Sequence, residues 1–452
     1  LDLHRVTLVV QDWGGLLGLT LPMEYPDRID RLIVMNTGLG VGRSPGPGFD
    51  AQRAPPACLA VLTPEQRAKS DAYFEGDYVL SVVDLAYGLA AAALILWSGW
   101  SRRMREFAQR ITRRPFLVAL LYAVGWIATM FVLNLPWASY TGFVREHAYG
   151  LATQSYGAWF GDHLKGLGVS MVLGAPVIAL IYAAVRRAGR AWWAWAGGIT
   201  LLFVMFGAMI APVYISPLFN DYQPLAAGPL RESILSLARA NRVPAEEVYQ
   251  FDASRQTTRI SANVSGMFGT TRVSLNDNLL KRTSDAEIRA VMGHEMGHFV
   301  LNHGIRLTIY LSLLLTAGYF VVARVLDWAI ARWGQRWGVT DRADPAGLPA
   351  ALAILTIFLS LTPPVENSII RQAEAEADAY GLASAREPHG FAMAAMRLST
   401  YRKIHPGPWE EIIFFDHPSG YDRVKRAMTW LEENQQAADV RARVTANSFG
   451  TN

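Results

Sequence analysis

The sequence VMGHEMGHFV, residues Val291–Val300, contains an H-E-x-x-H motif within an apolar stretch. Histidines four residues apart lie on the same face of an α-helix, so His294 and His298 can reach one metal ion. Zinc is the ion that such a pair usually binds. Glu295 lies between them, where a carboxylate can take the proton from a metal-bound water. We therefore predict a helix that carries a catalytic metal site.

The residues around the motif distinguish this prediction from a chance match. Ser284 and Glu287 form the S-x-x-E pattern of a capping box, which marks the start of a helix. Apolar residues such as Ile288, Met292 and Phe299 then surround the ionisable side chains of the motif. Burying several ionisable groups is costly unless something pairs them, and a metal ion would do so. The context thus favours a metal site.

The composition indicates a membrane protein. Of 452 residues, 51% are hydrophobic and only 18% are charged, whereas a soluble globular chain carries about 25% charged residues. Cys58 is the single cysteine, which excludes an intramolecular disulfide. The formal net charge is +4, and no basic stripe indicates a nucleic-acid partner.

Six long apolar segments predict membrane-spanning helices, because each is close to the roughly 20 residues that a bilayer requires. They lie near residues 78–100, 116–140, 166–185, 192–214, 305–330 and 348–365. A soluble buried helix can resemble one such segment, but a series of six favours a membrane protein.

Arginines are distributed unevenly among the predicted loops. Residues 101–115, 186–190 and 332–342 are rich in arginine, whereas residues 141–164 contain Arg145 alone. The positive-inside rule places arginine-rich loops in the cytoplasm. The metal-binding helix and the C-terminal region are then predicted on the opposite face, which is the periplasmic face of a bacterial inner membrane.

Residues 1–45 differ in pattern from the rest of the chain. Two predicted strands, residues 6–10 and 32–36, flank a tight turn at residues 11–15. This resembles the nucleophile elbow of haloalkane dehalogenases, with Asp12 at the nucleophile position. One strand–helix–strand unit cannot bury its own faces, and the other parts of such an enzyme have no counterpart downstream. We therefore expect a non-functional fused fragment.

The remaining chain divides by composition. Short strands at residues 248–251, 259–265 and 272–275 predict a small sheet, with glycines marking a hairpin turn after the second strand. The predicted parts are a partial α/β-hydrolase-like fragment (1–45), a linker and polar helix (46–77), four transmembrane helices (78–214), an extramembrane peptidase insertion with the H-E-x-x-H helix (215–304), two transmembrane helices (305–370) and a C-terminal helical domain with the third metal ligand (371–452).

A catalytic zinc site needs a third protein ligand beside an open position. Glu374 is the best candidate, and Asp378 follows four residues later on the same helix face. Asp378 could then accept the free N–H of a ligating histidine and fix its orientation. Glu376 points elsewhere on the helix, and we expect no role for it. Three further histidines have no partner at metal-binding spacing and are assigned no role: His303, His389 and His405.

Two residues near the C-terminus are candidates for transition-state stabilisation. His417, in the sequence Phe-Asp-His-Pro, could donate a hydrogen bond to the developing oxyanion. Arg423 could orient His417 or the substrate. From the residues alone, ordinary surface roles stay open for both.

Taken together, these residues resemble the integral-membrane zinc metallopeptidases of the CAAX prenyl protease 1 type and the related membrane heat-shock proteases. The resemblance covers residues 62–431, and it rests on the H-E-x-x-H motif, the R-x-x-E-x-x-A-D pattern of residues 371–378, and His417-Pro418 with Arg423. It implies that Glu374 is the third ligand of one zinc ion per chain. It also implies a mainly α fold, in which a multi-span transmembrane helical barrel joins a zincin-like domain of helices and a small β-sheet.

The resemblance extends to substrate binding and function. Residues 263–266 and 272–275 resemble the edge strand that binds substrate in this family, which assigns this role to Asn263, Val264 and Ser265. We expect a zinc-dependent membrane metalloendopeptidase with Glu295 and His417 as catalytic residues, supported by Asp378 and Arg423. Its partners are the lipid bilayer and peptide or protein substrates, prenylated CAAX proteins among them.

The chain also departs from the eukaryotic members, which have seven spans and a cytosolic site. Here six spans are predicted, and the arginine pattern favours the other face. A bacterial quality-control protease without prenyl specificity is therefore an alternative. A non-catalytic membrane scaffold is the other alternative, although the intact motif disfavours it.

Overall fold

The computed structural model describes residues 6–11, 29–35, 60–266 and 269–446. The chain forms two compact units, Leu1–Asp50 and Ala51–Asn452. In the first, β1 (Val6–Gln11) pairs in parallel with β2 (Ile29–Met35). Parallel pairing agrees with the strand–helix–strand pattern predicted there. Asp12, the predicted nucleophile position, lies outside the described residues.

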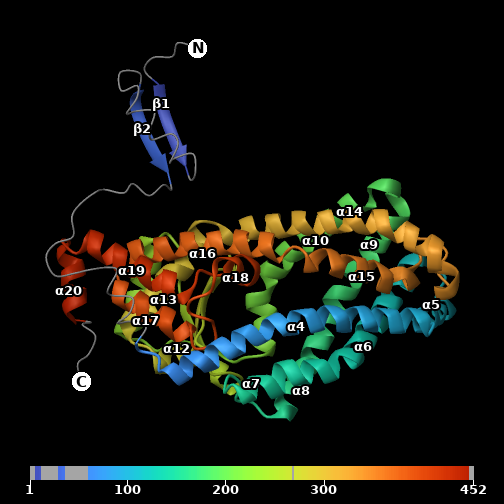
Figure 1. The fold of residues 1–452 in the computed structure, drawn as a ribbon, viewed down its shortest axis with the longest axis horizontal. Helices are drawn as coiled ribbons and strands as arrows, with labels where there is room; N and C mark the ends of the chain where they lie inside the picture. The colour runs from blue at the N-terminus through green and yellow to red at the C-terminus, as the bar shows by residue number, and fades with distance from the viewer. Residues whose placement is uncertain (1–5, 12–28, 36–59, 267–268, 447–452) are drawn as a thin grey trace. The chain divides into compact units, whose positions relative to one another are not determined.

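Membrane-length helices make up much of the second unit (Figure 1). Among the described residues, five helices are long and apolar enough to cross a membrane, and a sixth span results if one bent pair is counted as a span. The five are Pro64–Trp97, Pro115–Ala148, Tyr156–Arg187, Gly189–Leu218 and His303–Trp337, and the bent pair is Pro345–Ser360 with Pro363–Ala385.

The surfaces of these helices are apolar, as a lipid environment requires. Val82, Val172 and Leu202 have 69%, 71% and 69% of their area exposed. Helices satisfy their backbone hydrogen bonds internally, so they can tolerate contact with hydrocarbon. The bent pair meets at an angle of 60° immediately before Pro363 and Pro364, because proline removes a helical hydrogen bond and clashes with the preceding turn.

The first span differs from its prediction. The sequence separates a polar helix before residue 77 from a span that begins at residue 78, whereas α4 (Pro64–Trp97) runs through both. Thr63 and Gln66 form its capping box, and Pro64 occupies the first turn. No proline follows within the helix, so nothing interrupts its hydrogen bonds at the point where composition changes.

A small sheet lies beside the H-E-x-x-H helix. Its strands are β3 (Tyr222–Pro224), β4 (Val248–Phe251), β5 (Ala262–Ser265) and β6 (Arg272–Asn276), in the spatial order β3-β4-β6-β5. β4 and β6 are parallel, and the other neighbours are antiparallel. The predicted hairpin of β5 and β6 is present, with Asn263 opposite Ser274. β5 is an edge strand, so its outer side can pair with another strand.

Several further helices accompany the sheet. They are α11 (Pro229–Ala240), α12 (Asp277–Arg282), α13 (Asp285–Val300), α17 (Pro388–Leu398), α18 (Pro408–Phe414), α19 (Gly420–Asn434) and α20 (Ala438–Ala446). Of these, α11 and α17 pack against the motif helix α13. Met292 and Met296 of α13 share a buried core with Val273 and Leu275 of β6. In Figure 1 this part lies at one end of the membrane helices, and α5 (Trp100–Ile111) lies at the other.

Small residues let α13 approach α16 (Pro363–Ala385) closely. A Cβ atom added to Gly381 would lie 2.7 Å from the backbone nitrogen of His294, and one added to Gly293 would lie 2.9 Å from the Cβ of Ala385. Neither contact is possible without displacement. These glycines therefore allow two helices, which are separated in sequence by α14 (His303–Trp337) and α15 (Leu348–Ser360), to face each other.

Candidate metal centre and active site

The capping box predicted from the sequence is present at the start of α13. The Ser284 side chain accepts a hydrogen bond from the backbone N–H of Glu287 at 3.3 Å, and Glu287 Oε2 accepts one from the Ser284 backbone N–H at 2.7 Å. These bonds satisfy donors that a helix start leaves unpaired. They fix the register of the helix that carries the two motif histidines.

Three side chains converge between α13 and α16. The Nε2 atoms of His294 and His298 lie 3.1 Å apart. Nε2 of His294 lies 3.3 Å from Oε2 of Glu374, and Nε2 of His298 lies 3.3 Å from Oε1. Donor atoms about 2.0–2.1 Å from a tetrahedral zinc ion are separated by about 3.3 Å. Glu374 Oε2 is buried and has no hydrogen-bond partner among the described residues. The donor set and its spacing therefore fit one divalent ion.

Glu295 lies beside these donors without belonging to them. It lines a cavity of about 150 Å³, hereafter the catalytic cavity, together with His294, Glu374 and His417. Burial raises the pKa of Glu295 above that of an ordinary glutamate, although the neighbouring histidines oppose the shift. A carboxyl group with a raised pKa, placed next to a metal site, has the properties of a general base.

Asp378 supports His294 directly, as the sequence predicts. Asp378 Oδ1 lies 2.9 Å from Nδ1 of His294, and the aspartate is completely buried. Arg423 contacts both of its oxygens, at 2.5 and 3.1 Å, and Arg426 lies 3.2 Å from Oδ2. Nδ1–H of His294 can thus donate to Asp378 while Nε2 faces the metal position.

Within the described part of the chain, the hydrogen bonds of Arg423 reach the support of His294 and not His417. The sequence analysis has it orienting His417 or the substrate, whereas its hydrogen bonds reach Asp378, and its Nη2 lies 3.4 Å from His294 Nδ1. The side chain also lines the catalytic cavity. Its closest polar contacts are consistent with holding the buried aspartate.

His298 also has a supporting residue, His303, which the sequence analysis did not identify. His303 Nδ1 lies 3.0 Å from Nδ1 of His298, and His303 Nε2 lies 3.0 Å from Oε2 of Glu376. Arg306 pairs with the same carboxylate oxygen at 2.8 Å. If His298 Nε2 binds metal, its Nδ1–H donates to His303, and the Nε2–H of His303 donates to Glu376. The two residues assigned no role, His303 and Glu376, form this contact.

Spacing rules do not detect this support. Asn302 takes a left-handed conformation with φ of 54° between α13 and α14, and the chain turns so that His303 faces back to His298. Glu376 follows Glu374 by two residues, which separates them on the surface of α16. A histidine soon after the motif, followed by Arg306, was the available signal.

His417 reaches the metal position from a loop between α18 and α19. Its Nε2 lies 3.3 Å from Glu374 Oε2, and its Nδ1 lies 2.7 Å from Asp416 Oδ1. Arg371 holds the loop by donating hydrogen bonds to the carbonyl oxygens of Glu411 and Phe415, at 2.8 and 2.6 Å. The arrangement brings the predicted oxyanion donor into the catalytic cavity.

The predicted substrate-binding residues lie on the edge strand β5. They line a larger cavity, of about 730 Å³, which also includes His298. Ser265 donates a hydrogen bond to the side chain of Asn263 at 2.9 Å. Among the described residues, the lining of this cavity includes no Asp, Glu, Lys or Arg, and it extends to residues of membrane helices such as Ala208 and Leu307.

Comparisons with known proteins agree with this architecture. The family described as "CAAX prenyl protease N-terminal, five membrane helices" matches residues 49–221, and "Peptidase family M48" matches residues 224–431. The chain is 28% identical to "Uncharacterized metalloprotease YhfN" of Bacillus subtilis, over 81% of this chain and 86% of that protein. It is 27% identical to "CAAX prenyl protease 1 homolog" of Arabidopsis thaliana, over 82% and 89%.

A solved structure shows the same fold. The crystal structure of S. mikatae Ste24p superposes with a TM-score of 0.68 at 21% identity, covering 84% of this chain and 94% of that one. The family matches, the relatives and the fold lead to one conclusion. The chain belongs to peptidase family M48, as an integral-membrane metallopeptidase of the CAAX prenyl protease 1 type.

Proposed function

We propose that this protein is a zinc-dependent membrane endopeptidase in which His294, His298 and Glu374 hold one zinc ion. The observation that carries the proposal is the spacing of their donor atoms, 3.1 to 3.3 Å, in a buried position. When bound, zinc would polarise the scissile carbonyl and lower the pKa of a water molecule. Asp378 and Glu376 would orient the two histidines, directly and through His303.

Glu295 acts as the general base in this proposal. It accepts the proton of the attacking water and passes it to the leaving amine. Its raised pKa supports both steps, because the protonated form is more accessible near neutral pH than that of an exposed glutamate. His417 donates from Nε2 to the tetrahedral oxyanion, while Asp416 holds the ring through Nδ1 at 2.7 Å.

The substrate is proposed to bind as an added strand on the outer edge of β5. Backbone groups of Asn263–Ser265 would pair with the peptide, because the sheet order leaves that edge of β5 without a partner strand. The uncharged cavity beside β5 suits an apolar segment or lipid group of a membrane-associated protein. Prenylated CAAX proteins fit this chemistry, and relatives named CAAX prenyl protease support them as candidates.

Two alternative functions can each be tested. A quality-control protease would cleave peptides irrespective of a prenyl group, and a non-catalytic scaffold would be purified without metal. We place the peptidase part in the periplasm of a bacterium, because the arginine-rich α5 lies at the opposite end of the membrane helices (Figure 1).

The central experiment combines metal analysis with peptide cleavage in detergent. Glu295→Gln is expected to retain about one zinc per chain and lose cleavage by roughly a thousandfold or more. Glu232→Gln, which changes an exposed residue of α11, is the matched control and should retain both. Zinc-free wild-type protein, or full turnover by Glu295→Gln, would contradict the proposal. Farnesylated and unmodified versions of one peptide then distinguish the substrate classes.

A further inference from the structure

The catalytic cavity contains a cation that the proposed mechanism does not use. Its charged lining consists of Glu295, Glu374, Arg423 and Arg402. Arg423 is bound to Asp378. Arg402 is partly buried, and within the part of the chain that the structure describes its guanidinium has no hydrogen-bond or ion-pair partner. Asp416 lines an adjoining cavity with Arg402. Burial opposes the shift, but the hydrogen bond from His417 and the charge of Arg402 help to lower the pKa of Asp416, although Arg402 forms no ion pair with it. A partly buried guanidinium whose hydrogen-bond donors are unused can bind a further anion.

The backbone around Arg402 is held in place. The buried Ser70 Oγ lies 2.7 Å from the carbonyl oxygen of Ser399 and 2.9 Å from that of Arg402. Neighbouring cations are paired: Lys403 lies 2.7 Å from Glu75 Oε1, and Arg397 lies 2.5 Å from Glu287 Oε1. The fold thus fixes the main chain of Arg402 and leaves its side chain available in the cavity.

The edge strand indicates which part of a substrate would meet this residue. A peptide that pairs antiparallel with β5 runs in the opposite direction, so its C-terminal side lies toward the start of β5. Ala262 is the first residue of β5, and Ile260 and Ser261 precede it; all three line the catalytic cavity together with Arg402. Arg402 therefore lies on the side of the leaving peptide, an assignment that rests on the proposed function.

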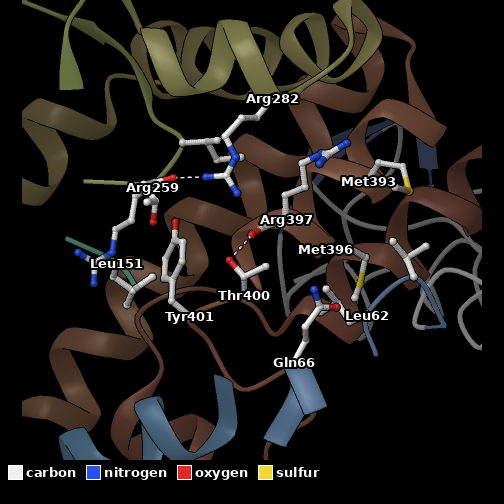
Figure 2. Close-up of a pocket in the computed structure, with 13 residues that line it drawn as sticks. Leu62, Gln66, Leu151, Arg259, Arg282, Met393, Met396, Arg397, Thr400 and Tyr401 are labelled. Carbon is white, nitrogen blue, oxygen red and sulfur yellow. Dashed lines mark hydrogen bonds between the residues drawn. The ribbon is translucent and has the colours of Figure 1, made fainter. Parts of the chain in front are cut away.

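A neighbouring cavity on this side is lined by further arginines. It has a volume of about 250 Å³ and shares Ile260 with the catalytic cavity. Figure 2 shows Arg259, Arg282 and Arg397 around it, and no Asp or Glu is among the residues that line it. The cavity along Asn263–Ser265, by contrast, is lined by no Asp, Glu, Lys or Arg within the described part of the chain. Arginines thus line the start of β5 and not the remainder of its length.

Two of these arginines are already paired. Arg259 is paired with Glu146 at 2.8 Å and Arg397 with Glu287 at 2.5 Å, so these two are neutralised. Arg402 of the catalytic cavity, in contrast, has no such ion pair among the described residues.

We propose that Arg402 binds a carboxylate of the substrate on the leaving side of the scissile bond and thereby determines specificity. Its planar guanidinium can form two parallel hydrogen bonds to a carboxylate. That carboxylate has two sources, the α-carboxylate at the end of a short leaving peptide and the side chain of Asp or Glu. The first source would make the enzyme selective for cleavage near a chain terminus.

The test uses the full-length zinc enzyme and one peptide sequence in four forms. The C-terminus is a free acid or an amide, and one leaving-side residue is Glu or Gln. Wild-type kcat/KM is expected to be about 10- to 100-fold higher for the form with the recognised carboxylate, because hydrogen bonds to charged groups contribute about 1.5–3 kcal/mol. The acid–amide pair and the Glu–Gln pair identify which carboxylate is bound.

Arg402→Gln should remove this preference while leaving cleavage of the neutral peptide within about twofold of wild type, since it loses only the charged contact. Arg402→Lys should retain part of it. Arg282→Gln is the matched control, because Arg282 lines the neighbouring cavity but not the catalytic cavity. Equal cleavage of all four peptides by wild type, or a preference that survives Arg402→Gln, overturns the inference. If no peptide is cleaved at all, the proposed function fails instead.

Discussion

The two motif histidines are supported in different ways by the two helices that meet them. His294 contacts Asp378 directly, and that aspartate is completely buried between Arg423 and Arg426. His298 contacts His303, which in turn contacts Glu376. The first support lies within the packed interface of α13 and α16, and the second at the start of the membrane helix α14. Each motif histidine needs an acceptor for its Nδ1–H. His294 finds it directly in Asp378, and His298 finds it in His303, which Glu376 holds in turn.

This difference has an energetic consequence. Asp378 neutralises the guanidinium of Arg423, which has little access to water, so its loss leaves a buried charge without this partner. Glu376 has 13% of its side chain exposed, and its partner Arg306 has 40%. Water can therefore replace part of the hydrogen bonding that Glu376 gives to His303 and Arg306. We expect the direct support to contribute to both folding and metal binding, and the relay to contribute mainly to metal binding.

The largest effect is expected from Glu374→Ala, which removes the carboxylate that lies 3.3 Å from both histidines. Metal content should fall close to zero, and cleavage should fall about a thousandfold or more because the metal supplies several kcal/mol of transition-state stabilisation. Metal analysis and a peptide assay measure the two effects. Retained stoichiometric zinc would contradict the role of Glu374 as a metal ligand beside both histidines.

Asp378→Asn should have the next largest effect, and it should act on two properties. Zinc affinity is expected to fall about 10- to 100-fold, as for other residues that orient a metal ligand. The free energy of unfolding is expected to fall by about 3–5 kcal/mol, because Arg423 loses its buried partner. Chelator competition and thermal unfolding of the metal-free protein separate the two. A normal Tm would contradict the assigned structural role.

Glu376→Gln tests the relay through His303. Zinc affinity should fall by about tenfold, at the low end for residues of this kind, and the Tm of the metal-free protein should change little. His303→Phe is the companion variant and should lower zinc affinity by a similar factor, because it removes the same acceptor for His298. The relay is refuted if both variants bind zinc like the wild type in a chelator competition.

The smallest effect concerns the pH dependence of metal uptake. Burial alone lowers the pKa of His294, but hydrogen bonds to Asp378 and Glu374 raise it to about 9 in the metal-free protein. Below that pH a proton competes with the metal, so apparent zinc affinity should rise with pH and level off near 9, by up to about tenfold per pH unit. In Asp378→Asn the levelling should begin at a lower pH. Calorimetric titration at several pH values measures this, and a flat profile would contradict it.

Much of this architecture follows from local sequence patterns. The capping box at Ser284 fixes where α13 begins, and the i, i+4 spacing places His294 and His298 on one face. Apolar length identifies the membrane helices, because a bilayer sets that length. The helix pair that bends before Pro363 follows from the lost hydrogen bond of proline. Each of these features depends on neighbours in sequence, which a single chain displays directly.

Other features depend on contacts between distant segments. The sequence by itself determined the metal-binding motif, the membrane helices and the hairpin strands, since periodicity, composition and capping act within one element. Only the tertiary structure decided that His303 faces His298, that Arg423 holds Asp378, and that Arg402 lines the catalytic cavity without a hydrogen bond or ion pair from its guanidinium to any described residue. These outcomes follow from the close approach of α13 and α16 and from the turn at Asn302. Which charges find partners is set by three-dimensional packing, and no spacing along the chain encodes it.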